Sequence, residues 1–120
     1  QLIITPYSML PEKIKLKLKN NQVLDYGLEI ERNNMESLKN YCTIPFPIAL
    51  AYALATLGGT NVKNIILAGF DGYPKGDIRN QEIESIFTIF KEKYEKINIY
   101  SVTPTNYFNL NSKSIYGYDL

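Results

Sequence analysis

The sequence of 120 residues contains no histidine and a single cysteine, Cys42. Histidine is the commonest general base and transition-metal ligand, so its absence excludes the Ser-His and Cys-His pairs of many hydrolases. One cysteine cannot form an internal disulfide, which suits a reducing compartment. We therefore expect a cytoplasmic protein in which Cys42 is a small buried thiol, with a reactive thiol as the alternative.

A strong net charge and a long apolar run are also missing. The 13 basic and 12 acidic residues leave a formal net charge of +1, so we expect neither nucleic acid nor a membrane as a partner. The longest mainly apolar run, Ile44 to Leu57, is shorter than the roughly 20 residues that cross a bilayer. The chain begins at Gln1 without a signal-like start, and we expect residues 1–120 to form one domain excised from a longer polypeptide.

The segment from Asn64 to Tyr73 is the most informative part of the sequence. Its residues 65–68 form an unbroken apolar run that ends in Gly69-Phe70-Asp71-Gly72. A strand buried on both faces gives such a run, so we predict a central parallel strand with an acid at its carboxyl end. Ligands of open α/β sheets gather just beyond that end, which makes Asp71 a candidate for ligand binding. The alternative is a turn former whose carboxylate accepts hydrogen bonds from nearby backbone N–H groups.

The first third of the chain predicts strands. Residues 1–4 are typical of an edge strand, and residues 13–19 alternate lysines with apolar side chains, as a strand with one wet face does. Residues 23–31 alternate again, and their acids can face the lysines across an antiparallel hairpin, at up to about 1 kcal/mol for each pair. The alternative for the lysine row is a phosphate-binding stripe. Residues 32–40 predict a connecting loop.

The rest of the chain predicts two helices and a further strand. Residues 45–57 form an apolar helix that starts near a cap at Thr43 and stops at Gly58-Gly59. Residues 80–94 place apolar side chains at steps of three and four, and residues 97–102 form a strand, which completes a βαβ unit. We predict a three-layer, Rossmann-like α/β domain whose sheet is mainly parallel, with an N-terminal antiparallel hairpin.

In this fold the loops that follow the two parallel strands open on one edge of the sheet, together with the amino end of the helix at Pro45. Such a helix end is a ready anion site, and hydroxyls beside a carboxylate suit a sugar, a nucleotide or a phosphorylated ligand. We expect these residues to form the site: Thr43, Gly69, Asp71, Gly72, Tyr73, Arg79, Thr103 and Thr105. The alternatives are that Thr103 to Thr105 is only a strand end and that Arg79 only forms a surface ion pair with Asp77.

Several known motifs are missing from the chain. It lacks the Gly-x-Gly-x-x-Gly dinucleotide fingerprint and the Gly-Lys-Thr/Ser phosphate loop. None of its carboxylates is spaced as a metal-ligand set. We therefore expect no metal, no cofactor and no catalytic residue in residues 1–120.

Two stretches together resemble a known domain. Ala49-Leu-Ala-Tyr-Ala-Leu-Ala55 and Ile65-Ile-Leu-Ala-Gly-Phe-Asp-Gly-Tyr73 are similar to the region after the barrel in certain bacterial aldolases. These aldolases are related to hydroxymethylglutaryl-CoA lyase and 4-hydroxy-2-oxovalerate aldolase and tend to be encoded among surface-polysaccharide genes. Asp77-Ile-Arg79 and Ser101-Val-Thr-Pro-Thr105 fit the same resemblance, which covers about residues 23–116. It implies an accessory, C-terminal Rossmann-like domain whose partner is an aldolase-type barrel in the same chain.

A second, shorter resemblance involves only the strand end at Leu67 to Asp71. It is similar to a strand end of bacterial sialyltransferases and MptE-like pterin pyrophosphokinases, which implies nucleotide-dependent transfer. This chain departs from both groups: it has no aldolase barrel, no catalytic histidine, and no small Ser/Thr/Gly loop at Thr43 to Pro47. Three functions therefore stay open: an accessory ligand-binding domain, a transferase with Asp71 as its base, and a structural or dimerising module that forms a homo-oligomer.

Overall fold

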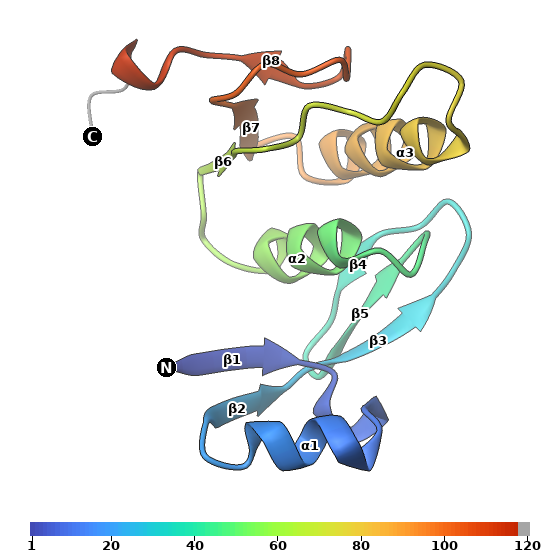
Figure 1. Ribbon diagram of the computed structural model, residues 1–120, viewed down its shortest axis with the longest axis vertical. Helices are drawn as coiled ribbons and strands as arrows, with labels where there is room; N and C mark the ends of the chain where they lie inside the picture. Colours follow the sequence, from blue (N-terminus) through green and yellow to red (C-terminus); the bar gives the residue numbers. More distant parts are fainter. Residues whose placement is uncertain (118–120) are drawn as a thin grey trace. The chain divides into compact units, whose positions relative to one another are not determined.

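The computed structural model describes residues 1–117 (Figure 1). The chain divides into two compact units, Gln1–Gly59 and a second unit that starts at Thr60. Both units combine helices with small sheets, which confirms the α/β class. The single domain expected for residues 1–120 stays a prediction. Among the described residues, no helix has the length and apolar character needed to cross a lipid bilayer.

The first unit contains a two-stranded sheet and a three-stranded sheet. The elements of this unit are β1 (Leu2–Thr5), η1 (Tyr7–Met9), α1 (Glu12–Leu18), β2 (Gln22–Asp25), β3 (Gly27–Ile30), β4 (Glu36–Ser37), β5 (Tyr41–Ile44) and α2 (Ala49–Gly58). Strand β1 pairs in parallel with β2, and the second sheet has the order β3-β5-β4, with β3 and β5 parallel and β4 antiparallel to β5. The edge strand expected at residues 1–4 is confirmed as β1.

The strand predicted at residues 13–19 and the antiparallel hairpin that it would form are wrong, whereas the strand predicted at residues 23–31 is present as β2 and β3. Residues 12–18 form helix α1, because lysine, leucine and isoleucine are also acceptable helix residues and Glu12 pairs with Lys15 one turn on, at 2.8 Å. Strands β2 and β3 continue one another through Tyr26, with partners on opposite sides. The N–H of Tyr26 donates to the carbonyl of Thr5 and the N–H of Gly27 to that of Asn40. Both pairings are parallel, so the predicted hairpin does not form.

The predicted loop at residues 32–40 and the predicted start of the apolar helix also differ from the structure. The loop contains the short strand β4, which pairs with β5. Helix α2 starts at Ala49 instead of Pro45, because each residue before a proline is disfavoured in helical conformation, and Pro45 and Pro47 both interrupt this stretch. Thr43 therefore lies in β5, and the residue that caps α2 is Ile48, without a side-chain hydrogen bond.

The second unit is built on a parallel βαβ unit, as predicted. Strands β6 (Asn64–Leu67) and β7 (Asn98–Ser101) pair in parallel, α3 (Ile78–Lys93) connects them, and the short strand β8 (Asn111–Ser112) pairs with β7. The segment η2 (Ile115–Gly117) follows. The core of this unit is made of buried side chains from α3, the two long strands and the segment after β7. They are Ile65, Ile83, Ile86, Phe87, Phe90, Ile99, Tyr107 and Leu110.

Strand β6 is not the central strand that its apolar run predicted. It lies at one end of the sheet order β6-β7-β8. Ile65 is buried, whereas Ile66, on the opposite face of the strand, is 45% exposed. An apolar run shows that both faces tolerate hydrophobic side chains, but it does not show that both faces are covered within one unit.

The stability of the first unit at high pH tests the contact between α2 and the segment at Tyr26. The hydroxyl of Tyr52 on α2 donates to the carbonyl of Tyr26 at 2.6 Å, and burial raises the pKa of Tyr52 from 10.0 to about 12. The folded state thus holds this proton more tightly than the unfolded state. The resulting stability is fully present below pH 10 and is lost as the pH rises through 12.

We expect Tyr52→Phe to lower the free energy of unfolding at pH 7 by about 1 kcal/mol, because one hydrogen bond is lost. The variant should also lose less stability than the parent between pH 10 and 12, since it has no proton to release. Urea unfolding followed by circular dichroism across this range measures both effects. Tyr41→Phe, which changes an exposed ring in the same unit, is the matched control. Equal alkaline losses in parent and Tyr52→Phe would contradict the assignment.

Candidate functional site

The carboxyl edge of the β6–β7 pair brings two polar loops together. Because the strands are parallel, the loop after Leu67 and the loop after Ser101 leave the sheet at the same edge. The backbone N–H of Gly69 donates to Oγ1 of Thr103 at 2.9 Å, and the N–H of Val102 donates to the carbonyl of Leu67 at 2.9 Å. The two loops are therefore joined directly.

The two threonines of the second loop use their hydroxyl oxygens to hold the loop. Oγ1 of Thr103 accepts the Gly69 bond, and the buried hydroxyl of Ser101 donates to the carbonyl of Thr103 at 2.7 Å. Oγ1 of Thr105 accepts from the N–H of Tyr107 at 3.2 Å, and the ring of Tyr107 packs edge-on against Phe87. Both threonines thus have structural partners within the edge.

Asp71 lies at the tip of the first loop and is exposed. Its backbone carbonyl accepts from the N–H of Asn106 at 2.9 Å, which fixes the loop. Within residues 1–117, no N–H, hydroxyl or cation is placed to bond its carboxylate. Gly69 and Gly72 on either side have positive φ angles, 78° and 111°, which glycine adopts without strain. A side chain at position 72 would also have its Cβ 3.3 Å from that of Asn106.

Tyr73 and Arg79 also lie together, but Asp77 takes part in the same cluster. The guanidinium of Arg79 lies over the ring of Tyr73, 3.9 Å from its centroid, and its Nη2 is 2.6 Å from Oδ2 of Asp77. The Asp77 carboxylate also accepts from the N–H of Arg79 at 2.9 Å and so caps α3. The ion pair foreseen between these residues is present. The guanidinium and the helix end are both engaged by the protein itself.

This cluster sets the charge of Asp77. The side-chain hydrogen bond from Arg79, together with the backbone N–H of the same residue, lowers the pKa of Asp77 from 3.8 to about 2. The same contact raises the pKa of Arg79. Both groups therefore stay charged throughout the neutral pH range.

Asn80 is a site residue that the sequence analysis missed. Its Oδ1 accepts from the N–H of Tyr73 at 2.9 Å, and its Nδ2 donates to the carbonyls of Tyr73 and Pro74 at 3.0 and 3.2 Å. One side chain on the first turn of α3 thus holds the loop that carries Asp71 and Tyr73. The only sequence signal for this role was an asparagine three residues after the helix cap. That signal did not show which backbone groups would lie near its side chain.

Seven of the eight predicted residues are in this second unit, at or beside the edge. Thr43 belongs to the first unit, where it is buried in β5 with 3% of its surface exposed. The amino end of α2, which was expected at the same edge, also belongs to the first unit. The place of Thr43 in a ligand site stays a prediction.

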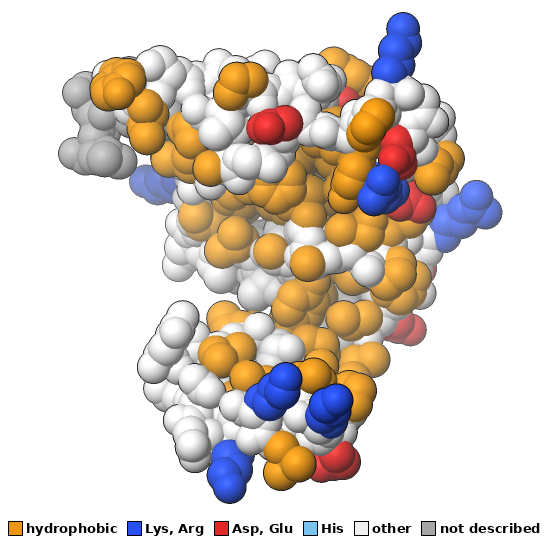
Figure 2. All heavy atoms as spheres, viewed as in Figure 1, with side chains coloured by type: hydrophobic (Ala, Val, Ile, Leu, Met, Phe, Trp, Pro, Cys, Tyr) orange, Lys and Arg blue, Asp and Glu red, His pale blue; other side chains and the backbone are white. Residues whose placement is uncertain are grey.

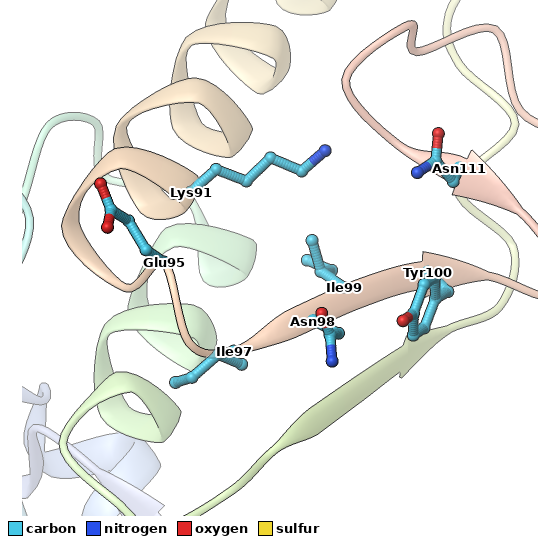
Figure 3. Close-up of a pocket in the computed structure, with 7 residues that line it drawn as sticks. All are labelled: Lys91, Glu95, Ile97, Asn98, Ile99, Tyr100 and Asn111. Atoms are coloured by element: carbon cyan, nitrogen blue, oxygen red, sulfur yellow. The ribbon is translucent and has the colours of Figure 1, made fainter.

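A separate hollow of about 330 Å³ lies at the other end of β7 (Figure 3). It is lined by Lys91, Glu95, Ile97, Asn98, Ile99, Tyr100 and Asn111, none of which the sequence analysis selected. In Figure 3, the side chain of Lys91 extends from α3 over Ile99 toward Asn111. Its ammonium donates to the carbonyl of Asn109, which attaches the segment before β8 to α3. This lysine has a structural role in the unit.

Within the described part of the chain, no group of three or more His, Cys, Asp and Glu side chains is placed to hold a metal ion. Compared with known proteins, the chain matches no family model, no curated protein and no solved structure. The resemblances drawn from the sequence therefore remain resemblances.

We expect Asn80→Ala to loosen the loop at residues 71–74. Three hydrogen bonds are lost, two of them to groups on Tyr73, so the free energy of unfolding of the second unit should fall by about 1–3 kcal/mol. Amide hydrogen exchange at Tyr73 should become faster, because its N–H loses its acceptor. Gln81→Ala, an exposed neighbour on the same turn, is the control. An unchanged exchange rate at Tyr73 would show that Asn80 does not hold the loop.

The acid titration of Asp77 tests the cluster with Arg79. Because the pKa in the folded state lies below 3.8, the interaction stabilises the fold above that pH and is lost as the pH falls through about 2. We expect Arg79→Ala to raise the Asp77 midpoint toward 3.8, but not fully, because the backbone N–H of residue 79 remains. Carbon-13 NMR of the Asp77 carboxyl group measures the midpoint. Lys75→Ala, on the same loop, should leave it unchanged, and a midpoint that stays near 2 in Arg79→Ala would refute the assignment.

Proposed function

We propose that this chain is a non-catalytic accessory domain of a larger aldolase-type enzyme of bacterial surface-sugar biosynthesis, and that it binds a hydroxyl-rich ligand at the Asp71 edge. The proposal places the domain in the cytoplasm, after an aldolase-type barrel that supplies the chemistry. It rests on the resemblance at residues 49–55 and 65–73 and on the geometry of the second unit.

Ligand binding is supported above all by the exposed carboxylate of Asp71, to which no donor in residues 1–117 is bonded. An aspartate that only forms a turn bonds its carboxylate to nearby backbone N–H groups. In the described residues the turn is instead held by the carbonyl of Asp71, by Thr103 and by Asn80. The carboxylate is exposed on a fixed loop at the strand end where α/β sheets hold their ligands. These facts favour a binding role over a turn-forming one.

Among the expected ligand classes, a sugar fits the edge better than a phosphate. Arg79 is paired with Asp77 and stacked on Tyr73, and the amino end of α3 is capped by the Asp77 carboxylate. A phosphate would have to compete with that carboxylate for both groups. Sugar hydroxyls, in contrast, can donate hydrogen bonds directly to a carboxylate such as that of Asp71. Nucleotides and phosphorylated sugars would be held through their sugar hydroxyls.

We infer a Rossmann-like, three-layer arrangement for the chain, supported by parallel pairing in both units and by the βαβ unit at β6-α3-β7. The single antiparallel pair in the described residues is β4 with β5. The accessory role is supported by the lack of histidine. Cys42, free and buried in β5, suits a reducing compartment.

A thermal-shift screen tests the proposal. The chain is heated with free sugars, sugar phosphates, sugar nucleotides, CMP, CTP, UDP and inorganic phosphate. A ligand at a hundred times its dissociation constant adds about 2.7 kcal/mol, which raises the melting temperature of a domain this size by about 10 °C or more. We expect sugars and sugar-containing compounds to shift the transition and inorganic phosphate to leave it unchanged.

Two variants locate the effect. Asp71→Asn keeps the shape of the loop and removes the charge, and it should abolish the shift while leaving the melting temperature without ligand nearly unchanged. Glu92→Gln on α3, an exposed acid in the same unit, should keep the shift. No shift with any compound would favour the structural or dimerising module. Transfer or hydrolysis of a bound sugar nucleotide would favour the transferase.

A further inference from the structure

Helix α1 carries a concentrated positive charge that the overall composition hides. Residues 12–19 contain four lysines and one glutamate, a net charge of +3, whereas the whole chain has +1, so the remainder has −2. The sequence analysis placed these lysines on a strand at residues 13–19, opposite the acids of residues 23–31 across a hairpin. In the structure Lys13, Lys15 and Lys17 lie on helix α1 and Lys19 is its C-cap residue, so the predicted strand pairing with residues 23–31 does not form.

The acids near α1 have partners other than Lys13, Lys17 and Lys19. Glu12 pairs with Lys15 at 2.8 Å, and Lys15 also lies over the ring of Tyr7. The Asp25 carboxylate accepts from the backbone N–H of Ser8 at 3.2 Å and from its hydroxyl. Within residues 1–117, no acidic side chain is within ion-pair distance of the three remaining lysines. These exposed residues are Lys13, Lys17 and Lys19.

The helix also places apolar side chains among these lysines. Two residues along a helix turn through about 200°, so Leu16 lies on the side opposite to Ile14 and Leu18. Leu16 is 67% exposed and has Lys13 and Lys19 as its neighbours three residues away on either side. Met9, on the preceding turn η1, is 60% exposed. Figure 2 shows basic side chains beside hydrophobic atoms on the surface formed by this part of the chain.

We propose that this surface, defined by Met9, Lys13, Leu16, Lys17 and Lys19, docks reversibly on an anionic lipid membrane. Lysines near an anionic leaflet are attracted by its negative potential, and exposed apolar side chains between them enter the headgroup region. A nucleic acid would leave Leu16 and Met9 without apolar partners. With three lysines and two apolar residues, the attachment is weak and easily reversed. The surface lies in the first unit and does not involve the Asp71 edge.

Co-sedimentation with vesicles tests this proposal. The full chain is mixed with vesicles of phosphatidylcholine containing a minority of phosphatidylserine, and with vesicles of phosphatidylcholine alone. We expect binding to the first and not to the second, and a decrease of binding with added salt, since the attraction between exposed charges is screened. Equal binding to both vesicle types, or none to either, would overturn the proposal.

Charge-reversal variants identify the surface. K13E/K17E/K19E should lower the partition coefficient on phosphatidylserine vesicles by about a hundredfold or more, because each lysine near the surface contributes about a fivefold increase. K63E/K75E/K96E makes the same change in net charge in the second unit and should bind as the parent does. Equal losses in both triple variants would overturn the assignment to this surface, because net charge alone would then account for binding. K13Q/K17Q/K19Q repeats the test without introducing acids, and circular dichroism verifies that α1 is retained.

Leu16→Ser separates a lipid surface from a general polyanion site. Because Leu16 is exposed, the variant should fold as the parent does, yet it should bind phosphatidylserine vesicles about tenfold more weakly. Unchanged vesicle binding in Leu16→Ser would overturn lipid insertion and favour a soluble polyanion. Self-association that disappears in K13E/K17E/K19E, without vesicle binding, would identify the surface as an interface between copies of the chain.

Discussion

The parallel pairing of β6 with β7 is the constraint on which the second unit depends. Two parallel strands cannot be joined by a tight turn, so the chain must cross from the end of one to the start of the other. Helix α3 makes this crossing, and its side chains Ile83, Ile86, Phe87 and Phe90 are buried. The same geometry places the ends of both strands at one edge. The candidate site is therefore a consequence of topology before any side chain there is considered.

At that edge, most polar groups are satisfied by the protein itself. Thr103, Thr105, Asn80 and the Asp77–Arg79 pair each hold a specific backbone or side-chain group, so the loops are fixed without a ligand. A preorganised loop costs less entropy when a ligand binds, since the ordering is already complete. Against this background the Asp71 carboxylate differs from its neighbours. It contributes charge and hydrogen-bonding capacity that the described fold does not use.

The sequence predicted the second unit far better than the first. Residues 80–94 repeat apolar side chains at helical spacing over four turns, and the flanking apolar runs are bounded by glycine and proline, so α3, β6 and β7 were foreseen within a few residues. Their parallel pairing followed from the order of the elements. For the edge, the sequence predicted which residues lie near one another but not the individual contacts between them. Asn80 bonds the backbone of Tyr73, and Asp77 caps α3. Both contacts depend on loop conformations that the periodicity of the sequence does not encode.

The first unit shows how an error in secondary structure changes a functional conclusion. Residues 13–19 alternate lysines with apolar side chains over only seven residues. A pattern this short cannot distinguish a strand from a short helix that is largely exposed to solvent. As a strand, the segment would place its lysines opposite acids and its leucines against a core. As helix α1, it separates Leu16 from Ile14 and leaves lysines around an exposed apolar side chain. The residues are the same, but their neighbours follow from the backbone, and their chemistry follows from the neighbours.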